Sequence, residues 1–336
     1  MNLERNVVKN KFSTIYVEKD ILDHENTKQI LSYFKDSQII VIHDYRDVFN
    51  RKRQNHVIQK RSQNLILAKK KKDFLYPASP VCQSFNHEYF YYASSMMNCI
   101  YDCEYCFLKG MYPSSHLVIF VNLEDFFKEC EEMLKKHPIY VCVSYDTDML
   151  ALEPIINYAY QWSEFVTSHK DMTIEIRTKG TFSNDWKKLA VSDNIILAFT
   201  LSPNYVSKQY EHGTPDLTSR IKMIHEALKL GYPCRICFDP IIVFPDYKQA
   251  YKDMVSQVKE NIDFNRIKDI SIGSFRISKN YLSHMRKQYM HSAVLQYPYV
   301  CEKGFYQLPN DLREEAEHLV LDELKDIQED KIFRWE

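Results

Sequence analysis

The sequence predicts an α/β fold in which a partial (β/α)6-type barrel follows a small N-terminal α/β unit and precedes a C-terminal extension. Two observations carry this prediction. From residue 89 onward, short runs rich in Val, Ile, Phe and Tyr alternate with longer helical patterns, as in βα units that build a parallel sheet with right-handed crossovers. Directly after the first of these runs, three cysteines fall within eight residues, at the strand end where such a barrel carries its chemistry.

Composition agrees with one large α/β domain and an appendage, or with two domains. The chain has 336 residues, 45% of them apolar, which is ample for a buried core. The net charge of −1 excludes a general polyanion binder, so any nucleic-acid contact needs a local basic patch. The six glycines form neither a G-x-G-x-x-G nor a Walker motif. Nine cysteines, without a leader or a long apolar run, predict a soluble cytoplasmic protein with no membrane partner.

The predicted N-terminal α/β unit covers residues 1–85. Apolar runs predict strands at 14–17 and 39–42, and an apolar face predicts a helix at 27–34. A basic segment follows at 44–72, and it is interpreted either as a solvated, partly disordered surface or as a face that lies along phosphates. No aromatic residues interleave its lysine run, so base stacking is not indicated there. Its basic residues are Arg46, Arg51, Lys52, Arg53, Lys60, Arg61, Lys69, Lys70, Lys71 and Lys72.

The predicted barrel covers residues 86–280 and is built from alternating strands and helices. The strands are expected at 89–93, 117–121, 139–144, 173–177, 195–201, 235–243 and 269–274. The helices are expected at 123–136, 154–169, 185–189, 218–230, 247–261 and 280–290. Residues 281–336 form the C-terminal extension, in which an amphipathic pattern at 312–327 predicts a closing helix. Cys234 and Cys237 lie three apart on a predicted strand and are interpreted as core residues, with a redox or metal pair as the alternative.

The three clustered cysteines, Cys99, Cys103 and Cys106, predict a metal or cluster site. Spacings of four and three residues let a loop turn three sulfurs toward one point. Iron–sulfur clusters are held by cysteine thiolates, and a four-iron cluster takes four ligands. Three cysteines therefore leave one iron with an open position, which can bind and activate a small molecule, as the open position of a catalytic zinc does.

Three other interpretations of this motif remain. A zinc ion could be held by the same cysteines together with His87 or His116, although zinc sites usually combine a C-x2-C pair with a second pair farther on. A disulfide is disfavoured because no secretory signal is present. The cysteines could also be clustered core residues. If the cysteines hold zinc, the chain would be a metal- or nucleic-acid-binding protein that is not an enzyme, and it would use the basic segment for binding.

The C-x3-C-x2-C spacing, followed by Phe107 and Leu108, resembles the cluster loop of radical S-adenosylmethionine (radical SAM) enzymes. Further stretches, which cover most of residues 89–275, resemble the spore photoproduct lyase family. These are residues 99–108, 112–122, 144–153, 176–180, 198–215, 220–233 and 239–247. The resemblance implies a partial (β/α)6-type TIM barrel, a [4Fe-4S] cluster and S-adenosyl-L-methionine. It also implies a radical SAM lyase of DNA repair, which cleaves the methylene-bridged thymine dimer by a 5′-deoxyadenosyl radical.

The resemblance also implies roles for single residues. The cluster ligands would be Cys99, Cys103 and Cys106. The family binds S-adenosylmethionine through a tyrosine inside the cysteine motif, and through hydroxyl, aspartate and lysine residues after the third, fourth and fifth strands. The corresponding residues here are Tyr105, Thr147, Asp148, Lys179, Thr200 and Ser202. A lysine ammonium suits the carboxylate of this cofactor, and aspartate and hydroxyl groups suit its amine and ribose.

Simpler structural roles compete with these assignments. Lys179 could be a surface residue at a strand end. Thr147 and Asp148 could cap a helix that begins at residue 149, which would not exclude binding. Glu211 and His212 are interpreted as residues that shape the turn before a proline rather than as catalytic groups.

Two departures from the family concern the hydrogen donor. The family uses a cysteine after its third strand to give a hydrogen atom to the product radical, and Tyr145 occupies that position here. Cys142 lies three residues earlier, so on a strand it points to the opposite face, and it is alternatively an ordinary buried residue. Phe107 occupies the position of the outer tyrosine of the family's relay. The catalytic candidates are therefore Cys142, Tyr145 and Tyr105, with Cys301 as a further candidate.

Because of these two departures, the chain could alternatively be a paralogue of the family that performs radical chemistry on another substrate. The partners implied by the resemblance are lesion-containing DNA and a reductant such as flavodoxin or ferredoxin. The family has a basic aromatic hairpin that helps to extrude the lesion, because a radical cannot reach a base inside the stack. Residues 297–306 correspond to this hairpin but carry only one lysine and one glutamate, which predicts weaker phosphate binding.

Overall fold

The computed structural model describes residues 11–79, 82–181 and 187–335, so the helix expected at 185–189 begins outside the described residues. The chain divides into two compact units. The first unit comprises Met1–Ile100, Met111–Arg177 and Phe182–Ile195, and the second comprises Tyr101–Gly110, Thr178–Thr181 and Ile196–Glu336. The domain boundaries expected at residues 85 and 280 stay a prediction.

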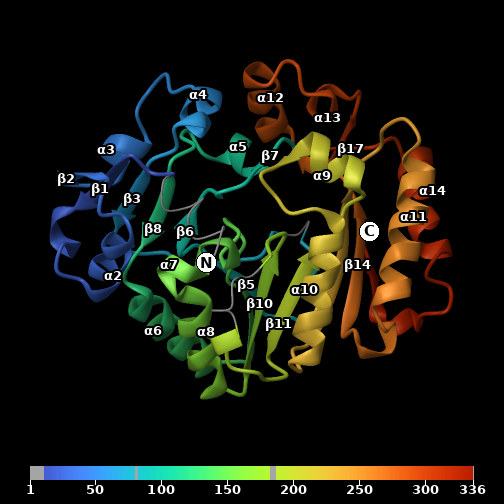
Figure 1. The fold of residues 1–336 in the computed structure, drawn as a ribbon, viewed down its shortest axis with the longest axis horizontal. Coiled ribbons are helices and arrows are strands. Elements are labelled where there is room, and N and C mark those ends of the chain that lie inside the picture. The colour runs from blue at the N-terminus through green and yellow to red at the C-terminus, as the bar shows by residue number, and fades with distance from the viewer. Residues whose placement is uncertain (1–10, 80–81, 182–186, 336) are drawn as a thin grey trace. The chain divides into compact units, whose positions relative to one another are not determined.

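The first unit begins with a sheet of five strands in the order β2-β1-β3-β8-β6 (Figure 1). All neighbours are parallel except β6, which runs antiparallel to β8. The strands are β1 (Thr14–Glu18), β2 (Gln38–Ile42), β3 (Leu65–Ala68), β6 (Met96–Met97) and β8 (Leu117–Phe120). The helices that accompany them are η1 (Lys19–Ile21), α2 (Glu25–Tyr33), α3 (Arg46–Phe49) and α4 (His56–Arg61). Every residue of β3 and β8 is buried, as expected for apolar strands covered on both faces.

Two sequence-based expectations are wrong in this sheet. The run at 117–121 was expected among the barrel strands, but as β8 it pairs with β3, and Leu117 lies opposite Leu65. For the basic segment at 44–72, the expected partial disorder is wrong, because the segment folds into α3, α4 and the buried strand β3. Most of its basic residues are nevertheless exposed. An apolar run reveals a strand but not its neighbour in the sheet, since pairing depends on the tertiary context.

A second group of strands in the first unit carries several predicted site residues. They are β4 (Leu75–Pro77), β5 (Phe90–Ala93), β9 (Ile139–Cys142) and β10 (Met172–Thr178). Strands β5, β9 and β10 are parallel, and β4 runs antiparallel to β5. The helices are α6 (Leu123–Leu134), η2 (Leu150–Leu152), α7 (Glu153–Ile156) and α8 (Tyr158–Thr167).

The helix expected at 154–169 is divided into α7 and α8 at Asn157. This residue has φ 57°, a left-handed conformation that asparagine tolerates better than most residues. The Glu153 carboxylate accepts hydrogen bonds at 2.8 Å from the N–H groups of Ala159 and Tyr160. The carboxylate thus satisfies donors that the break leaves exposed at the start of α8.

The second unit contains the parallel strands β11 (Ile195–Thr200), β13 (Cys234–Ile241), β14 (Asp269–Ser274) and β18 (Ile332–Arg334). Its longer helices are α10 (Leu217–Lys229), α11 (Tyr247–Asn261), α12 (Lys279–Gln288) and α14 (Asn310–Asp322). Helices α11 and α14 pack side by side (Figure 1), so the amphipathic C-terminal helix is confirmed. Cys234 and Cys237 are fully buried in β13, which confirms that they are core residues.

Smaller elements complete the second unit. They are α5 (Leu108–Met111), α9 (Asn204–Tyr210), α13 (Ala293–Gln296), η4 (Phe264–Arg266), η5 (Glu329–Lys331), β7 (Asp102–Cys103), β12 (Glu211–His212), β15 (Arg276–Ser278), β16 (Val300–Glu302) and β17 (Phe305–Gln307). Strands β16 and β17 are antiparallel neighbours, so the region expected as a hairpin is one. None of the helices in the described part of the chain is long and apolar enough to cross a bilayer.

Candidate active site

The start of the cysteine loop is held by side chains of the first unit that bind its backbone carbonyls. Lys60 Nζ donates to Cys99 O at 2.6 Å, and Gln63 Nε2 donates to the same oxygen at 3.2 Å. Lys11 Nζ donates to Ile100 O at 2.6 Å. The two ammonium groups fix the backbone of the first predicted cluster ligand and place positive charge beside it, which stabilises a nearby thiolate.

The histidines of the alternative zinc site have other roles. His116 Nδ1 accepts the backbone N–H of Asn64 at 3.2 Å, and burial together with Arg51 lowers the pKa of His116 to about 4. The ring of His87 stacks on Tyr140 with the ring centroids 4.2 Å apart. Both imidazoles are thus used within the fold of the first unit.

The other two predicted ligands lie in the second unit, on a segment that is held from both sides. Cys103 belongs to β7 and pairs with Glu211 in β12. Between the two cysteines, the Glu104 N–H donates to Tyr210 O at 2.7 Å, and the Glu104 carboxylate accepts from Ser292 Oγ at 2.5 Å. Across the residues that the structure describes, no three His, Cys, Asp or Glu side chains form a ready metal cage. The cluster assignment therefore rests on donor chemistry and motif.

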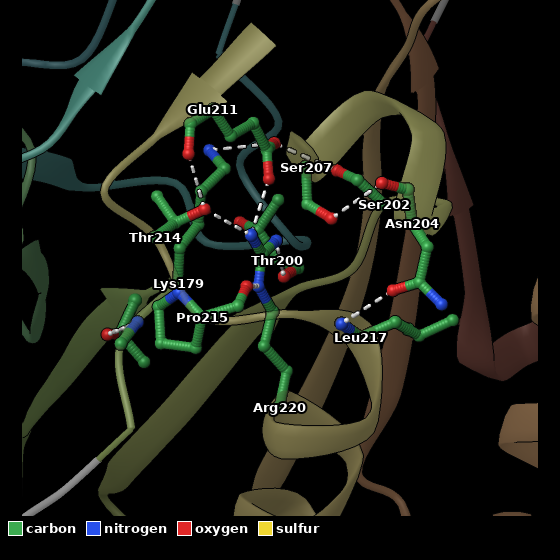
Figure 2. Close-up of polar contacts among 12 residues, drawn as sticks. Lys179, Thr200, Ser202, Asn204, Ser207, Glu211, Thr214, Pro215, Leu217 and Arg220 are labelled. Carbon is green, nitrogen blue, oxygen red and sulfur yellow. Dashed lines mark hydrogen bonds and ion pairs between the residues drawn. The ribbon is translucent and has the colours of Figure 1, made fainter. Parts of the chain in front are cut away.

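A buried polar network surrounds Glu211, which is fully buried. Arg220 Nη2 donates to Glu211 Oε2 at 2.5 Å, and Ser202 Oγ donates to Glu211 Oε1 at 2.9 Å (Figure 2). The Tyr105 hydroxyl also donates to Glu211 Oε1. Lys179 Nζ lies 3.9 Å from the same oxygen. Three residues predicted for the cofactor, Tyr105, Lys179 and Ser202, are thus gathered on one carboxylate.

Arg220 connects the network to a further predicted position. Its Nη1 donates to Thr200 O at 3.1 Å, its Nε donates to Pro215 O at 3.0 Å, and its Nη2 also donates to Thr214 Oγ1 at 2.8 Å (Figure 2). Arg220 thereby ties the end of β11 to the turn that precedes α10. The turn role expected for Glu211 is confirmed, because Thr214 N–H donates to Glu211 O at 3.1 Å. Its side-chain role was missed, as was Arg220.

The charges of this network are set by competition between burial and ion pairing. Burial alone would raise the pKa of Glu211, but Arg220 and Lys179 outweigh it and hold this pKa below its ordinary value. Burial alone would lower the pKa of Lys179, but Cys103 and Glu211 outweigh it and raise this pKa. Two cations thus share one buried carboxylate. The local surplus of positive charge suits thiolates and the carboxylate of an amino acid.

The remaining predicted cofactor residues lie in the first unit. Asp148 Oδ1 accepts the N–H of Ala151, a residue of the short helix η2, at 3.3 Å. Asp148 therefore satisfies a backbone donor of η2, although the N-cap residue of that helix is Met149. Thr147 Oγ1 is buried and has no hydrogen-bond partner among the described residues. A buried hydroxyl without a partner is unfavourable unless a ligand or water binds it. The Thr147 hydroxyl is therefore suited to bind a ligand.

Cys142 and Tyr145, the candidate hydrogen donors, have different surroundings within the first unit. Cys142 is buried at the end of β9, with its Sγ 3.9 Å from Glu175 Oε1. The Tyr145 hydroxyl lies 3.6 Å from Cys82 Sγ. Cys82 was not predicted as a site residue, because it lies outside the cysteine motif and its partner is 63 positions away.

Comparison with solved structures defines the fold class. A spore photoproduct lyase mutant aligns with a TM-score of 0.82 at 14% identity, over 97% of this chain and 98% of the other. A double mutant with bound AdoMet and dinucleoside spore photoproduct aligns with a TM-score of 0.80 at 14% identity, over 97% of this chain and 99% of the other. These likenesses confirm the α/β fold of the radical SAM barrel kind.

Sequence comparison identifies the family within this class. The family model for spore photoproduct lyase matches residues 11–296. A spore photoproduct lyase of Clostridium acetobutylicum is 20% identical over 278 residues, 76% of each chain. The chain belongs to the spore photoproduct lyase family. It is therefore a radical SAM lyase of DNA repair that uses a [4Fe-4S] cluster and S-adenosyl-L-methionine, and the paralogue with another substrate is not favoured.

Proposed function

We propose that Cys99, Cys103 and Cys106 hold the cluster, and that Tyr105, Thr147, Asp148, Lys179, Thr200 and Ser202 form the cofactor site of an enzyme that cleaves the spore photoproduct in DNA. The observation that carries this proposal is the buried network around Glu211 in the second unit. Tyr105 and Ser202 donate to one carboxylate, and Lys179 lies beside it. These residues come from segments far apart in the sequence, and family resemblance predicts all three for the same ligand.

When bound, the cluster and S-adenosylmethionine would supply a 5′-deoxyadenosyl radical for hydrogen-atom abstraction from the lesion. Lys179 would pair with the carboxylate of this cofactor. Glu211 holds the lysine and the Tyr105 ring in place, and the Lys179 ammonium lies 5.5 Å from the centroid of that ring. Arg220 compensates the charge of Glu211, so that the carboxylate does not cancel the ammonium that the ligand needs.

The basic segment supports DNA as the partner, although only part of it can contact phosphates. Lys60 binds the cysteine loop, and burial lowers the pKa of Lys70, which lies near two aromatic rings. The exposed basic residues of the segment are Arg46, Arg51, Lys52, Arg53, Arg61, Lys69, Lys71 and Lys72. Exposed cations bind DNA through counterion release, so we expect affinity to fall steeply with salt.

Electron supply and location complete the proposal. A flavodoxin or ferredoxin of low potential would reduce the cluster, and the cytoplasm would keep the nine cysteines reduced. Anaerobically reconstituted protein should form deoxyadenosine and repaired thymine with reduced flavodoxin or ferredoxin. Activity with a chemical reductant but with neither protein would contradict the proposed partner.

The cofactor site is tested by binding. Lys179→Met removes a charge-assisted contact worth about 1.5–3 kcal/mol, so reconstituted protein should bind S-adenosylmethionine about 10- to 100-fold more weakly in equilibrium dialysis. Lys222→Met, which replaces an exposed lysine of α10, should bind as the parent does. Equal affinities of the Lys179→Met and Lys222→Met variants would contradict the site, whatever the outcome of the repair assay.

A further inference from the structure

A cysteine outside the metal motif contacts the tyrosine that stands at the family's hydrogen-donor position. Cys82 Sγ and the Tyr145 hydroxyl are 3.6 Å apart, and either atom can act as the hydrogen-bond donor. The Cys82 N–H donates to Ser79 O at 2.8 Å, which holds the backbone of the residue that carries the thiol. Both side chains are half-buried, so the pair lies within the first unit but is not fully enclosed in its core.

The ring of Tyr145 is held by aromatic stacking. Its centroid lies 4.4 Å from that of Tyr92, and Tyr92 in turn stacks on Tyr76 with the centroids 5.2 Å apart. Burial raises the pKa of Tyr145, and the neighbouring Cys82 raises it further. The phenol therefore keeps its O–H hydrogen at neutral pH.

Cys142 has a different environment, although it is closer in the sequence to the donor position. Its side chain is 4% exposed, and its thiol faces the Glu175 carboxylate. That carboxylate also accepts from the Tyr140 hydroxyl at 2.6 Å and from Arg177 Nε at 3.0 Å. Cys142 thus belongs to a core polar network, and the neighbouring Cys82 adds to the rise of its pKa. The thiol that lies within hydrogen-bond range of the Tyr145 hydroxyl is that of Cys82.

We propose that Cys82 is the hydrogen-atom donor of the repair reaction and that Tyr145 regenerates it; this inference rests on the proposed function above. The family combines a donor thiol with a relay phenol, and this chain lacks both at the usual positions, which read Tyr145 and Phe107. The contact between Cys82 and Tyr145 restores one thiol and one phenol as a pair. Two separate departures from the family are thereby explained by one rearrangement.

The proposed step balances in atoms and electrons. The S–H bond of Cys82 breaks and a C–H bond forms on the thymine-derived methylene radical, which leaves a repaired methyl group and a thiyl radical. The Tyr145 O–H then gives its hydrogen atom to the sulfur. One electron from the low-potential reductant and one proton from water restore the phenol. No net charge moves in either hydrogen-atom transfer, so the pair needs no counter-ion.

The test is a single turnover of the reconstituted protein with dinucleoside spore photoproduct in D2O. The thiol exchanges its hydrogen with solvent, so the parent should place one deuterium in the repaired thymine methyl group for each deoxyadenosine formed. In Cys82→Ala and Cys82→Ser, deoxyadenosine should form as in the parent, whereas repaired thymine should fall at least tenfold, because a serine O–H is too strong to give a hydrogen atom. Cys130→Ala, which removes a buried thiol of α6, should behave as the parent.

Other outcomes separate the two proposals. Parent-like repair by Cys82→Ala, or loss of repair in Cys142→Ala with Cys82→Ala unaffected, would overturn the assignment of Cys82. Parent protein that binds S-adenosylmethionine but leaves the lesion intact would instead overturn the proposed function. A readout without cofactor is alkylation by iodoacetamide followed by mass spectrometry: the dinucleoside lesion should slow labelling of Cys82 several-fold in the unreconstituted protein. Unchanged labelling would contradict a thiol that faces the substrate.

Discussion

Two tyrosines, one in each unit, have opposite chemical surroundings. Tyr105 in the second unit donates to Glu211, a buried carboxylate that is neutralised by Arg220 and approached by Lys179. Tyr145 in the first unit contacts the Cys82 thiol and the ring of Tyr92, none of which needs to carry a charge. The first phenol belongs to an ionic network, whereas the direct contacts of the second are with a thiol and an aromatic ring.

This difference matches two different tasks. A ligand with a carboxylate, an amine and a sulfonium is bound best by fixed charges, and buried charges must themselves be paired. Hydrogen-atom transfer moves an electron and a proton together and leaves each partner neutral, so it does not need fixed charges beside the reacting groups. The comparison therefore predicts that the network around Glu211 governs stability and cofactor binding, whereas the pair of Cys82 and Tyr145 governs product formation.

The largest effect is expected from breaking the ionic network. Arg220→Met leaves Glu211 buried beside Lys179 alone and removes the donors to Thr200 O and Pro215 O. Breaking a buried pair in this way costs about 3–5 kcal/mol, which urea unfolding should show as a lower midpoint. Lys222→Met on the same helix should change stability by less than about 0.5 kcal/mol.

A double variant sharpens this test. Arg220→Met combined with Glu211→Gln removes both charges, so its loss of stability should be smaller than the sum of the two single losses, as for residues that interact directly. Additive losses would show that Arg220 and Glu211 do not stabilise each other. Tyr105 would then not belong to a coupled ionic network, and the comparison with Tyr145 would fail.

The second prediction concerns stability, which should depend on pH in a different pH range in each of the two units. Burial and Arg51 lower the pKa of His116 in the first unit from 6.5 to about 4. The unfolded chain then binds a proton that the folded chain excludes, so stability falls as the pH drops from 6.5 toward 4, by at most about 1.4 kcal/mol per pH unit. The pKa of Glu211 is lowered below 4.5, so its contribution is present above pH 4.5 and is lost only as the pH falls through its folded value.

The measurement is the urea midpoint as a function of pH. His116→Gln retains an acceptor for the Asn64 N–H but cannot titrate, so it should flatten the curve between pH 6.5 and 4. Identical slopes for the His116→Gln variant and the parent would exclude His116 as the source.

Most of the fold could be predicted because its elements are defined locally. Helices α6, α10, α11 and α14 and strands β9, β10, β11, β13 and β14 lie where the apolar patterns predict them. Strand β3 was missed because basic residues surround its four apolar positions, and β8 was assigned to the wrong sheet because its run of Leu, Val, Ile and Phe would suit either one. Sheet membership depends on residues distant in sequence.

The candidate site shows the same limit. The three motif cysteines stand out by their spacing, and Lys179 follows a recognisable strand. Glu211 became important only when the fold brought Tyr105, from 106 positions earlier, and Arg220, from the next helix, onto its two oxygens. Cys82 had no local signal, because a single cysteine in a loop is common and its meaning depends on the contact with Tyr145.

The smallest expected effect compares the two tyrosines by the same substitution. Tyr105→Phe removes a hydrogen bond to a buried carboxylate and should lower the free energy of unfolding by about 1.5–3 kcal/mol. Tyr145→Phe removes only a contact with a thiol, which is a weak hydrogen-bonding group, and should cost less than about 1 kcal/mol. In repair assays, Tyr145→Phe should complete the first turnover and then stop, because no phenol is left to return the Cys82 thiyl radical to the thiol. Equal losses of stability in the two variants would contradict the special role of Tyr105 in the network around Glu211. Sustained turnover by Tyr145→Phe would contradict the proposal that Tyr145 returns a hydrogen atom to Cys82.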